Sequence, residues 1–258
     1  MVTAQNITSE YHDPLTNFTF HGWASDSGYR FGLIVPPSDQ ATDFIAQLVG
    51  PLNTDGGGWA GVAFGRSMMG PLLLAAWPTG DPSHPVIVSP RVAHGKSADL
   101  VHVYDNHPVQ VKLIPQGTTV NSTHFTATIL CQGCVNSDSF EMTASSEQFG
   151  YAHSLKKVET PGSQGTRLSS HSPPDGSRGS FGIDITQAKS EEFASYAQAA
   201  VAVVDSTAAP TTAGGSRPTG TAVGVAPTGT KPSGAEGRRS GMVGLVLAGL
   251  IAAVRVMI

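Results

Sequence analysis

The sequence has few charged residues, few aromatic residues and only two cysteines. Charged residues make up 13% of the 258 positions and aromatic residues 7%, and the net charge is −4. This small negative charge gives no indication of nucleic-acid binding, which needs a basic surface. The dinucleotide-binding, P-loop, zinc-protease and serine-hydrolase motifs are absent as well. With 40% apolar residues, the chain is nevertheless long enough to bury one sizeable core.

An apolar leader segment is also missing from residues 1–14, although other features indicate an exported protein. Sequences that accept N-linked glycans occur at Asn6, Asn17 and Asn121. The low cysteine count, with Cys131 and Cys134 close together, is compatible with an oxidising compartment. We therefore expect an extracellular protein whose natural N-terminus lies upstream of this sequence.

The composition changes sharply after the first 204 residues. We expect a folded domain over residues 5–204, followed by a solvated stalk over residues 205–241, which are rich in Thr, Pro, Gly and Ser. Residues 242–258 form an apolar tail, which is short for a membrane span of about 20 residues. Small residues at 233–235 and a polar spacer precede the tail, as in a glycolipid-anchor (GPI) signal. We expect such an anchor, with a single membrane helix or an artefact of gene prediction as the alternatives.

Ten short apolar or alternating runs, separated by Gly, Pro, Asn and Asp, predict β-strands. They cover residues 18–24, 29–35, 43–50, 58–64, 72–77, 85–89, 109–114, 124–130, 148–153 and 179–185. Strands at this spacing are typical of an antiparallel sandwich or barrel. Residues 186–204 predict a single helix with Thr186 as its N-cap. The apolar face of this helix would consist of Phe193, Tyr196, Ala197 and Ala200.

Two methionines occupy a glycine-bounded turn in the stretch GVAFGRSMMGPLLLAAW, residues 61–77. A methionine in a loop, such as Met68 or Met69, can simply fill space over the end of a core. Its thioether can instead ligate haem iron opposite a histidine, a ligand pair that raises the potential of the iron. This second interpretation requires a histidine from another loop.

Three segments, GWAGVAFGRSMMGPLLLAAW, NSTHFTATILCQGC and SSHSPPDGSRGSFGIDI, occur in this order between roughly residues 10 and 200. In order and spacing they resemble the haem-binding cytochrome domain of fungal cellobiose dehydrogenases. The resemblance implies an all-β, antiparallel immunoglobulin-like sandwich with one non-covalent haem b in a pocket at one end. It implies Met68 and His171 as the axial ligands of the iron, with Met69 as the second choice for the sulfur.

The third segment departs from the family pattern, because about four extra residues, including Pro173 and Pro174, separate His171 from SFGID. If this longer loop displaced the imidazole, His153 would be the nearest substitute in sequence.

The resemblance extends to positions near the haem propionates and to the cysteines. Lys96 stands where the relatives place a tyrosine near a propionate, and Arg91 is close in sequence, so either cation could pair with that carboxylate. The resemblance also implies a small structural disulfide between Cys131 and Cys134. A redox dithiol or half of a zinc site would each need a sequence context that is absent here.

With both axial positions taken by protein, the resemblance implies outer-sphere transfer of single electrons through an exposed haem edge. The implied donor is an extracellular flavin dehydrogenase, and the implied acceptor is a copper polysaccharide monooxygenase, a ferric complex or a quinone. We expect a cytochrome domain without a flavin domain and therefore no oxidation of cellobiose, which leaves its status as an enzyme open. A cell-surface ferric reductase and a haem-free carbohydrate-binding or adhesion sandwich are the two alternative functions.

Overall fold

The structure, a computed structural model, describes residues 8–95 and 101–206. Asn6, Lys96, the predicted apolar tail and nearly all of the predicted stalk lie outside these residues. Only residues 205 and 206 of that stalk are described, and they form the end of a helix.

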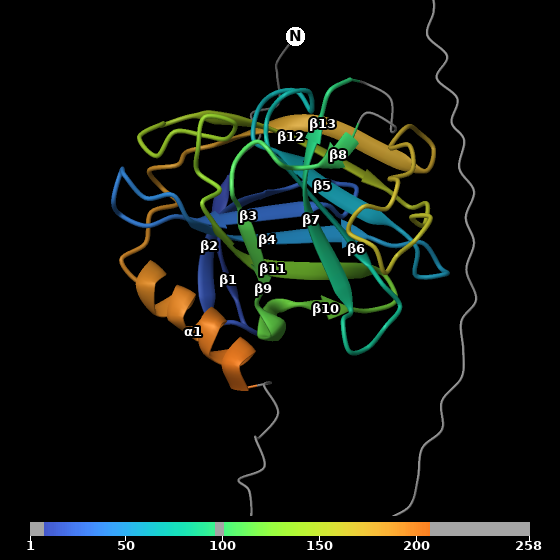
Figure 1. The fold of residues 1–258 in the computed structure, drawn as a ribbon, viewed down its shortest axis with the longest axis horizontal. Coiled ribbons are helices and arrows are strands. Elements are labelled where there is room, and N and C mark those ends of the chain that lie inside the picture. Colours follow the sequence, from blue (N-terminus) through green and yellow to red (C-terminus); the bar gives the residue numbers. More distant parts are fainter. Residues whose placement is uncertain (1–7, 96–100, 207–258) are drawn as a thin grey trace, which may run out of the picture. The chain divides into compact units, whose positions relative to one another are not determined.

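Within the described residues, thirteen strands form two antiparallel sheets that make a sandwich (Figure 1). The seven-stranded sheet contains β1 (Ser9–Asp13), β2 (Phe18–Ala24), β3 (Arg30–Ile34), β4 (Phe44–Pro51), β9 (Gln110–Leu113), β10 (Thr119–Val120) and β11 (His124–Gln132). The six-stranded sheet contains β5 (Trp59–Ala63), β6 (Leu73–Pro78), β7 (Val86–Ala93), β8 (Val101–Val103), β12 (Glu147–Ser154) and β13 (Gly176–Ile183). The strand orders are β1-β2-β3-β4-β11-β10, with β9 also paired to β11, and β13-β12-β5-β6-β7-β8.

All ten predicted strands are present, and the predicted all-β sandwich is confirmed. The prediction missed β1, β8 and β10, which are short strands at or near sheet edges. Their sequences, SEYHD, VHV and TV, are too short or too polar to show the alternation of a strand with one buried face.

The core between the sheets is built on phenylalanine rings from both sheets. Phe31 of β3 is fully buried, and its ring centroid lies 6.0–6.2 Å from those of Phe64, Phe149 and Phe181. Aromatic rings at this separation add to the apolar area that they bury. The two sheets are therefore held face to face by one continuous cluster.

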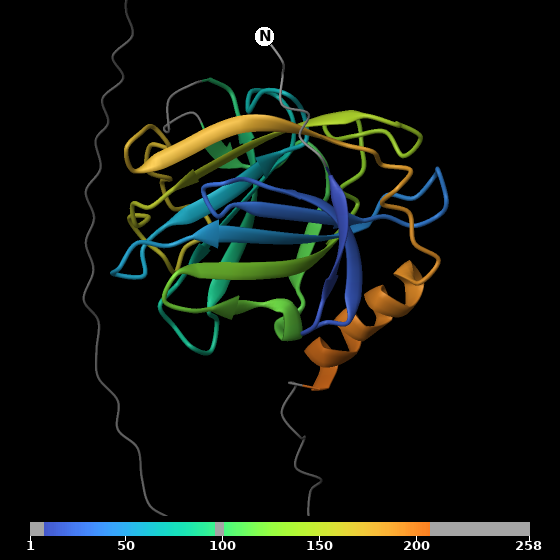
Figure 2. The same cartoon turned by 180° about the vertical axis from the view of Figure 1, so that it is seen from behind.

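The helix α1 (Phe193–Ser206) packs on part of the outer face of the seven-stranded sheet, and Figure 2 shows it at the lower right of the sheet, seen from behind. Its predicted apolar face is confirmed, because Phe193 and Ala200 are buried with Phe18 and Ile34 of the sheet. A short 3₁₀ helix, η2 (Pro115–Gly117), precedes β10. In the part of the chain that the structure describes, no helix has the length and apolarity needed to cross a bilayer.

The predicted start of this helix at Thr186 is wrong. The Asp184 carboxylate accepts hydrogen bonds from the N–H and O–H groups of Thr186, at 2.9 and 2.6 Å, which makes a turn. The chain then pairs with the sheet: the Val35 N–H donates to the Ala188 carbonyl, and the Ser190 N–H donates to the Val35 carbonyl. These bonds use backbone groups that a helix would need, so α1 begins only at Phe193.

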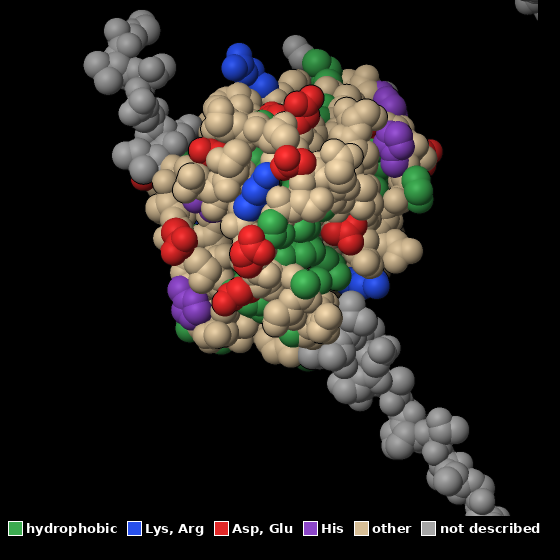
Figure 3. Space-filling model, turned by 90° about the vertical axis from the view of Figure 1, so that its left-hand side faces the viewer, with side chains coloured by type: hydrophobic (Ala, Val, Ile, Leu, Met, Phe, Trp, Pro, Cys, Tyr) green, Lys and Arg blue, Asp and Glu red, His purple; other side chains and the backbone are tan. Residues whose placement is uncertain are grey.

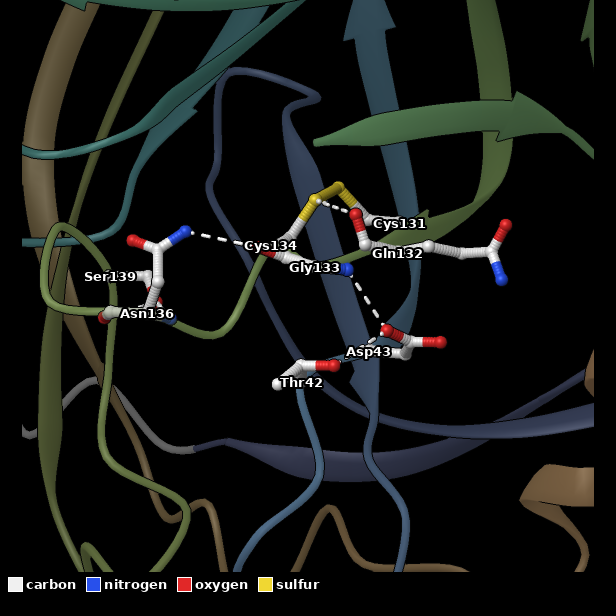
Figure 4. Close-up of a disulfide and its surroundings, with 8 residues drawn as sticks. All are labelled: Thr42, Asp43, Cys131, Gln132, Gly133, Cys134, Asn136 and Ser139. Atoms are coloured by element: carbon white, nitrogen blue, oxygen red, sulfur yellow. Dashed lines mark hydrogen bonds between the residues drawn. A yellow bond between two sulfur atoms is a disulfide. The ribbon is translucent and has the colours of Figure 1, made fainter. Parts of the chain in front are cut away.

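The disulfide implied by the resemblance is present between Cys131 and Cys134 (Figure 4). It closes a tight turn after β11, in which Gly133 has a φ of +70° that favours glycine. The Gly133 N–H donates to the Asp43 carboxylate at 2.9 Å, and the Asn136 side chain donates to the Gly133 carbonyl at 3.1 Å. The turn is therefore tied to the segment before β4 as well as closed by the disulfide.

The core predicts a sharp contrast between two apolar truncations. Phe31→Ala should lower the free energy of unfolding by about 3–5 kcal/mol, because it leaves a cavity among the buried rings. Leu15→Ala, at a side chain that is 57% exposed, should change the same free energy by less than about 0.5 kcal/mol. Urea unfolding measures both variants, and equal effects would contradict this assignment of the core.

Candidate functional site

A cavity of about 810 Å³ lies against the outer face of the six-stranded sheet. Its floor consists of small residues on neighbouring strands: Gly61 and Ala63 of β5, Ala75 of β6, and Gly150 and Ala152 of β12. The residues that alternate with them, such as Val62 and Phe149, belong to the core between the sheets. The sequence predicted a pocket at one end of the sandwich. The cavity lies on this outer face, where small side chains leave room for a flat group.

The β5–β6 turn brings Met68 to one side of this cavity. The turn is held by two backbone hydrogen bonds, from the Gly150 N–H to the Gly65 carbonyl (2.8 Å) and from the Gly70 N–H to the Ala93 carbonyl (3.1 Å). Met68 lines the cavity and packs on the apolar cluster of Ala63, Leu73 and Ala93. Met69, in contrast, is 43% exposed and is not among the lining residues.

The β12–β13 connection, residues 155–175, brings His171 to the same cavity. The His171 ring contacts Trp59 edge to face, with 6.1 Å between ring centroids. Trp59 begins β5, whereas Met68 packs on Ala63 at the end of β5, so the two side chains approach the floor near opposite ends of one strand. The extra residues of this loop, with a cis peptide bond between Pro173 and Pro174, do not displace His171 from the cavity.

Three side chains of the sheet hold this connection in place by donating hydrogen bonds to it. Trp59 Nε1 donates to the Ser169 carbonyl at 3.1 Å, and Trp77 Nε1 donates to the Pro161 carbonyl at 2.8 Å. Arg91 Nη2 donates to the Thr166 carbonyl at 3.0 Å. The loop is thus fastened at three points along its length.

Arg91 is 2% exposed, and it lines the cavity as well as supporting the loop. Its Nε donates to Ser89 Oγ at 2.8 Å, and Nη2 also donates to the Gln164 carbonyl. Burial lowers the pKa of its guanidinium group. Among the described residues, Nη1 makes no hydrogen bond, so a buried cation faces the cavity with donor capacity to spare.

The environment of His171 favours a neutral imidazole. Burial lowers its pKa, and the positive charge of Arg178 lowers it further. Neutral imidazole is the form that ligates metal ions. The Nδ1 atom of His171 is buried without a hydrogen-bond partner.

His153, the substitute ligand considered from the sequence, does not line the cavity. It lies on β12 and its Nε2 is 2.8 Å from Ser27 Oγ, in the β2–β3 connection of the other sheet. Burial lowers its pKa, and the nearby His171 adds to this effect. The structure therefore brings His171, and not His153, together with Met68.

Comparisons with known proteins identify the family of this chain. The family described as the cytochrome domain of cellobiose dehydrogenase matches residues 11–195. The chain belongs to this cytochrome-domain family.

Two solved structures are similar to this cytochrome domain. The cytochrome domain of Myriococcum thermophilum cellobiose dehydrogenase has 25% sequence identity and a TM-score of 0.64, with 76% of this chain and 97% of that one covered. The cytochrome b domain of pyranose dehydrogenase from Coprinopsis cinerea has 24% identity and a TM-score of 0.62, with 75% and 96% covered.

Membership of the cytochrome-domain family implies a bound haem, and the residues at the cavity fit such a group. Met68 offers a thioether and His171 a neutral imidazole, the soft and borderline donors that hold haem iron. The glycine and alanine residues of the floor leave space that larger side chains in their place would occupy. Arg91 offers a buried positive charge near which a carboxylate could bind.

Several residues of the cavity were missed by sequence reasoning. Trp59 is buried in an apolar cluster with Ala75 and Trp77, and it also forms a wall of the cavity beside His171. Small residues at alternate positions of GWAGVAF are the signal that could have identified the floor, since they leave one face of a strand bare. The 155–175 connection carries no such signal, because its role depends on contacts between distant segments, such as the hydrogen bond from Ser89 Oγ to the Gln164 carbonyl.

The two predicted glycosylation sites that the structure describes lie away from the cavity. Asn17 and Asn121 are both exposed and do not line it, so both are accessible for modification. The Asn121 Oδ1 atom accepts hydrogen bonds from the N–H groups of Thr123 and His124, at 2.8 and 2.9 Å.

The position of His171 predicts a strong effect of Gly176→Ala. A Cβ at residue 176 would lie 2.5 Å from the His171 carbonyl carbon and 2.7 Å from the His153 carbonyl oxygen. Because both neighbours are backbone atoms, the loop must move, at a cost of about 1–3 kcal/mol of unfolding free energy. Haem uptake, measured by absorbance after addition of haem, should fall as well, because the loop that carries His171 has moved.

Gly162→Ala, in the β12–β13 connection, is the matched control, because a Cβ at residue 162 would meet no atom within 4 Å. This variant should keep both its stability and its haem uptake. Normal haem uptake by Gly176→Ala would show that the close backbone approach does not position His171.

Proposed function

We propose that this cytochrome domain is an extracellular electron-transfer module that holds haem b between Met68 and His171. The main support is that a thioether and an imidazole from separate connections line one cavity above a floor of small residues. When bound, the haem supplies a one-electron Fe(III)/Fe(II) couple. The chain supplies the two ligands, the enclosing walls and the cations at the cavity.

The packing favours Met68 over Met69 as the sulfur ligand. Met68 is partly buried at the cavity, whereas Met69 is largely exposed outside it. For His171 we assign Nε2 to the iron, because Nδ1 is buried in the protein. Arg91 would bind a propionate through Nη1, and Lys96 remains a second candidate for that carboxylate on the sequence resemblance alone.

With two protein ligands, the domain would act as a carrier and would depend on a donor and an acceptor. The two solved relatives are named as domains of sugar dehydrogenases. We therefore propose an extracellular flavin dehydrogenase as the donor. A copper polysaccharide monooxygenase, a ferric complex or a quinone would be the acceptor, and a cell-surface ferric reductase would differ only in this last step.

The ligand assignment predicts distinct spectra for three single variants. The purified protein should show sharp reduced α and β bands in the visible spectrum after addition of dithionite. Met68→Ala and His171→Ala should lose these bands, because each removes one axial ligand. Met69→Ala is the matched control and should keep them.

Two outcomes would contradict these assignments. Loss of the bands in Met69→Ala, with their retention in Met68→Ala, would move the ligand to the neighbouring methionine. A folded, disulfide-bonded protein that takes up no haem would leave the carbohydrate-binding or adhesion sandwich as the function.

The exposed Asn17 and Asn121 and the disulfide of Cys131 and Cys134 support an exported domain. We propose that residues 205–241 tether it to the cell surface and that residues 242–258 signal a glycolipid anchor. Phosphatidylinositol-specific phospholipase C should then release the natural protein from cells. If it stays on the cells while a known glycolipid-anchored protein is released, a membrane helix is the anchor.

A further inference from the structure

Basic residues are concentrated at the cavity. Among the described residues that line it, five are basic and one, Glu159, is acidic. The basic residues are Arg66, Arg91, Lys157, Arg167 and Arg178. They are a third of the 15 Lys and Arg residues of a chain whose net charge is −4. The cavity is therefore a positive region on an acidic protein.

A bound haem accounts for only part of this charge. Its two propionates would carry two negative charges, and Arg91 is the cation that is buried to receive one of them. Glu159 Oε1 lies 3.6 Å from Arg167 Nη1, and its negative charge neutralises the positive charge of Arg167. Five positive charges against these three negative ones leave a surplus of about two, on side chains that reach solvent.

The four other cations are exposed and come from three separate segments. Arg66 lies on the β5–β6 turn, Lys157 and Arg167 on the β12–β13 connection, and Arg178 on β13. They share no sequence motif and meet only around the cavity. Figure 3 shows a different surface, on the side of α1, where Asp and Glu side chains are spread around an apolar patch.

We infer that these four exposed cations form a docking surface for an acidic patch on the protein that exchanges electrons with this domain. These four residues, Arg66, Lys157, Arg167 and Arg178, are called the basic rim. The inference rests on the proposed function, because it takes the rim to bind the protein that exchanges electrons with the haem. Opposite charges on two facing surfaces raise the rate of encounter by about 10–1,000-fold and orient the partners. A partner held at this rim would lie directly over the cavity that contains the redox group.

Docking can be tested without knowledge of the natural partner. The probe is a fluorescently labelled hexaglutamate peptide, added to the purified protein at low ionic strength and followed by anisotropy. Arg66→Glu/Lys157→Glu should weaken binding about tenfold or more, since it reverses two of the four exposed cations. Binding should also weaken as salt is raised to about 0.1 M, where the screening length falls to about 10 Å.

The matched control is Arg30→Glu/Lys112→Glu, which makes the same change in net charge on β3 and β9 of the other sheet. It should change the affinity for the peptide by less than about twofold, because neither residue lines the cavity. Equal weakening by both pairs would mean that only net charge matters, and it would overturn the docking surface. Absence of peptide binding at low salt would overturn it as well.

A second readout separates this inference from the proposed function. The same samples are mixed with ferricyanide after reduction, and the bimolecular rate should fall about tenfold in the rim pair but not in the control pair. Visible spectra recorded first report whether haem is bound. Normal spectra with charge-independent binding and rates would reject the docking surface alone. Colourless protein would reject the proposed function and, with it, the redox role of this surface, even if the peptide still bound there.

Discussion

The site depends on the N–H donors of Trp59, Trp77 and Arg91, which meet carbonyls of the β12–β13 connection. Leaving such a buried donor without its acceptor costs about 1–3 kcal/mol, and more for a charged group. The connection is therefore fixed where it passes over the sheet, although it contains no strand or helix of its own. Because it carries His171, the same bonds that satisfy the sheet's side chains also position the proposed ligand.

The sequence predicts the strands well because each has one face buried in a common core. Alternation places Phe31 and Leu33 in that core, and the local pattern alone is enough to identify β3. Met68 and His171 were found through resemblance to a family, since neither residue differs locally from an ordinary loop residue. The structure adds that both line one cavity, and it separates Met68 from the exposed Met69.

The errors of sequence reasoning arise where distant segments compete for the same groups. Residues 186–190 have helical periodicity, but the backbone pairs with Val35 at the sheet edge, so the helix starts later. Arg91 was predicted only as a partner for a propionate, yet its Nη2 also holds the β12–β13 connection through the Gln164 and Thr166 carbonyls. The basic rim is invisible in the sequence for the same reason, because its members come together only when the sheet and its connections fold.

The two outer faces of the sandwich differ in how their apolar residues are covered. Helix α1 covers the seven-stranded sheet with a continuous apolar cluster. On the six-stranded sheet the apolar residues form two clusters, one around Trp59 and Trp77 and one around Ala63 and Leu73. Both clusters use β5 and β6, and the cavity is lined by residues of both. A flat apolar group bound there would join the clusters into one layer, so its binding free energy would also stabilise the fold.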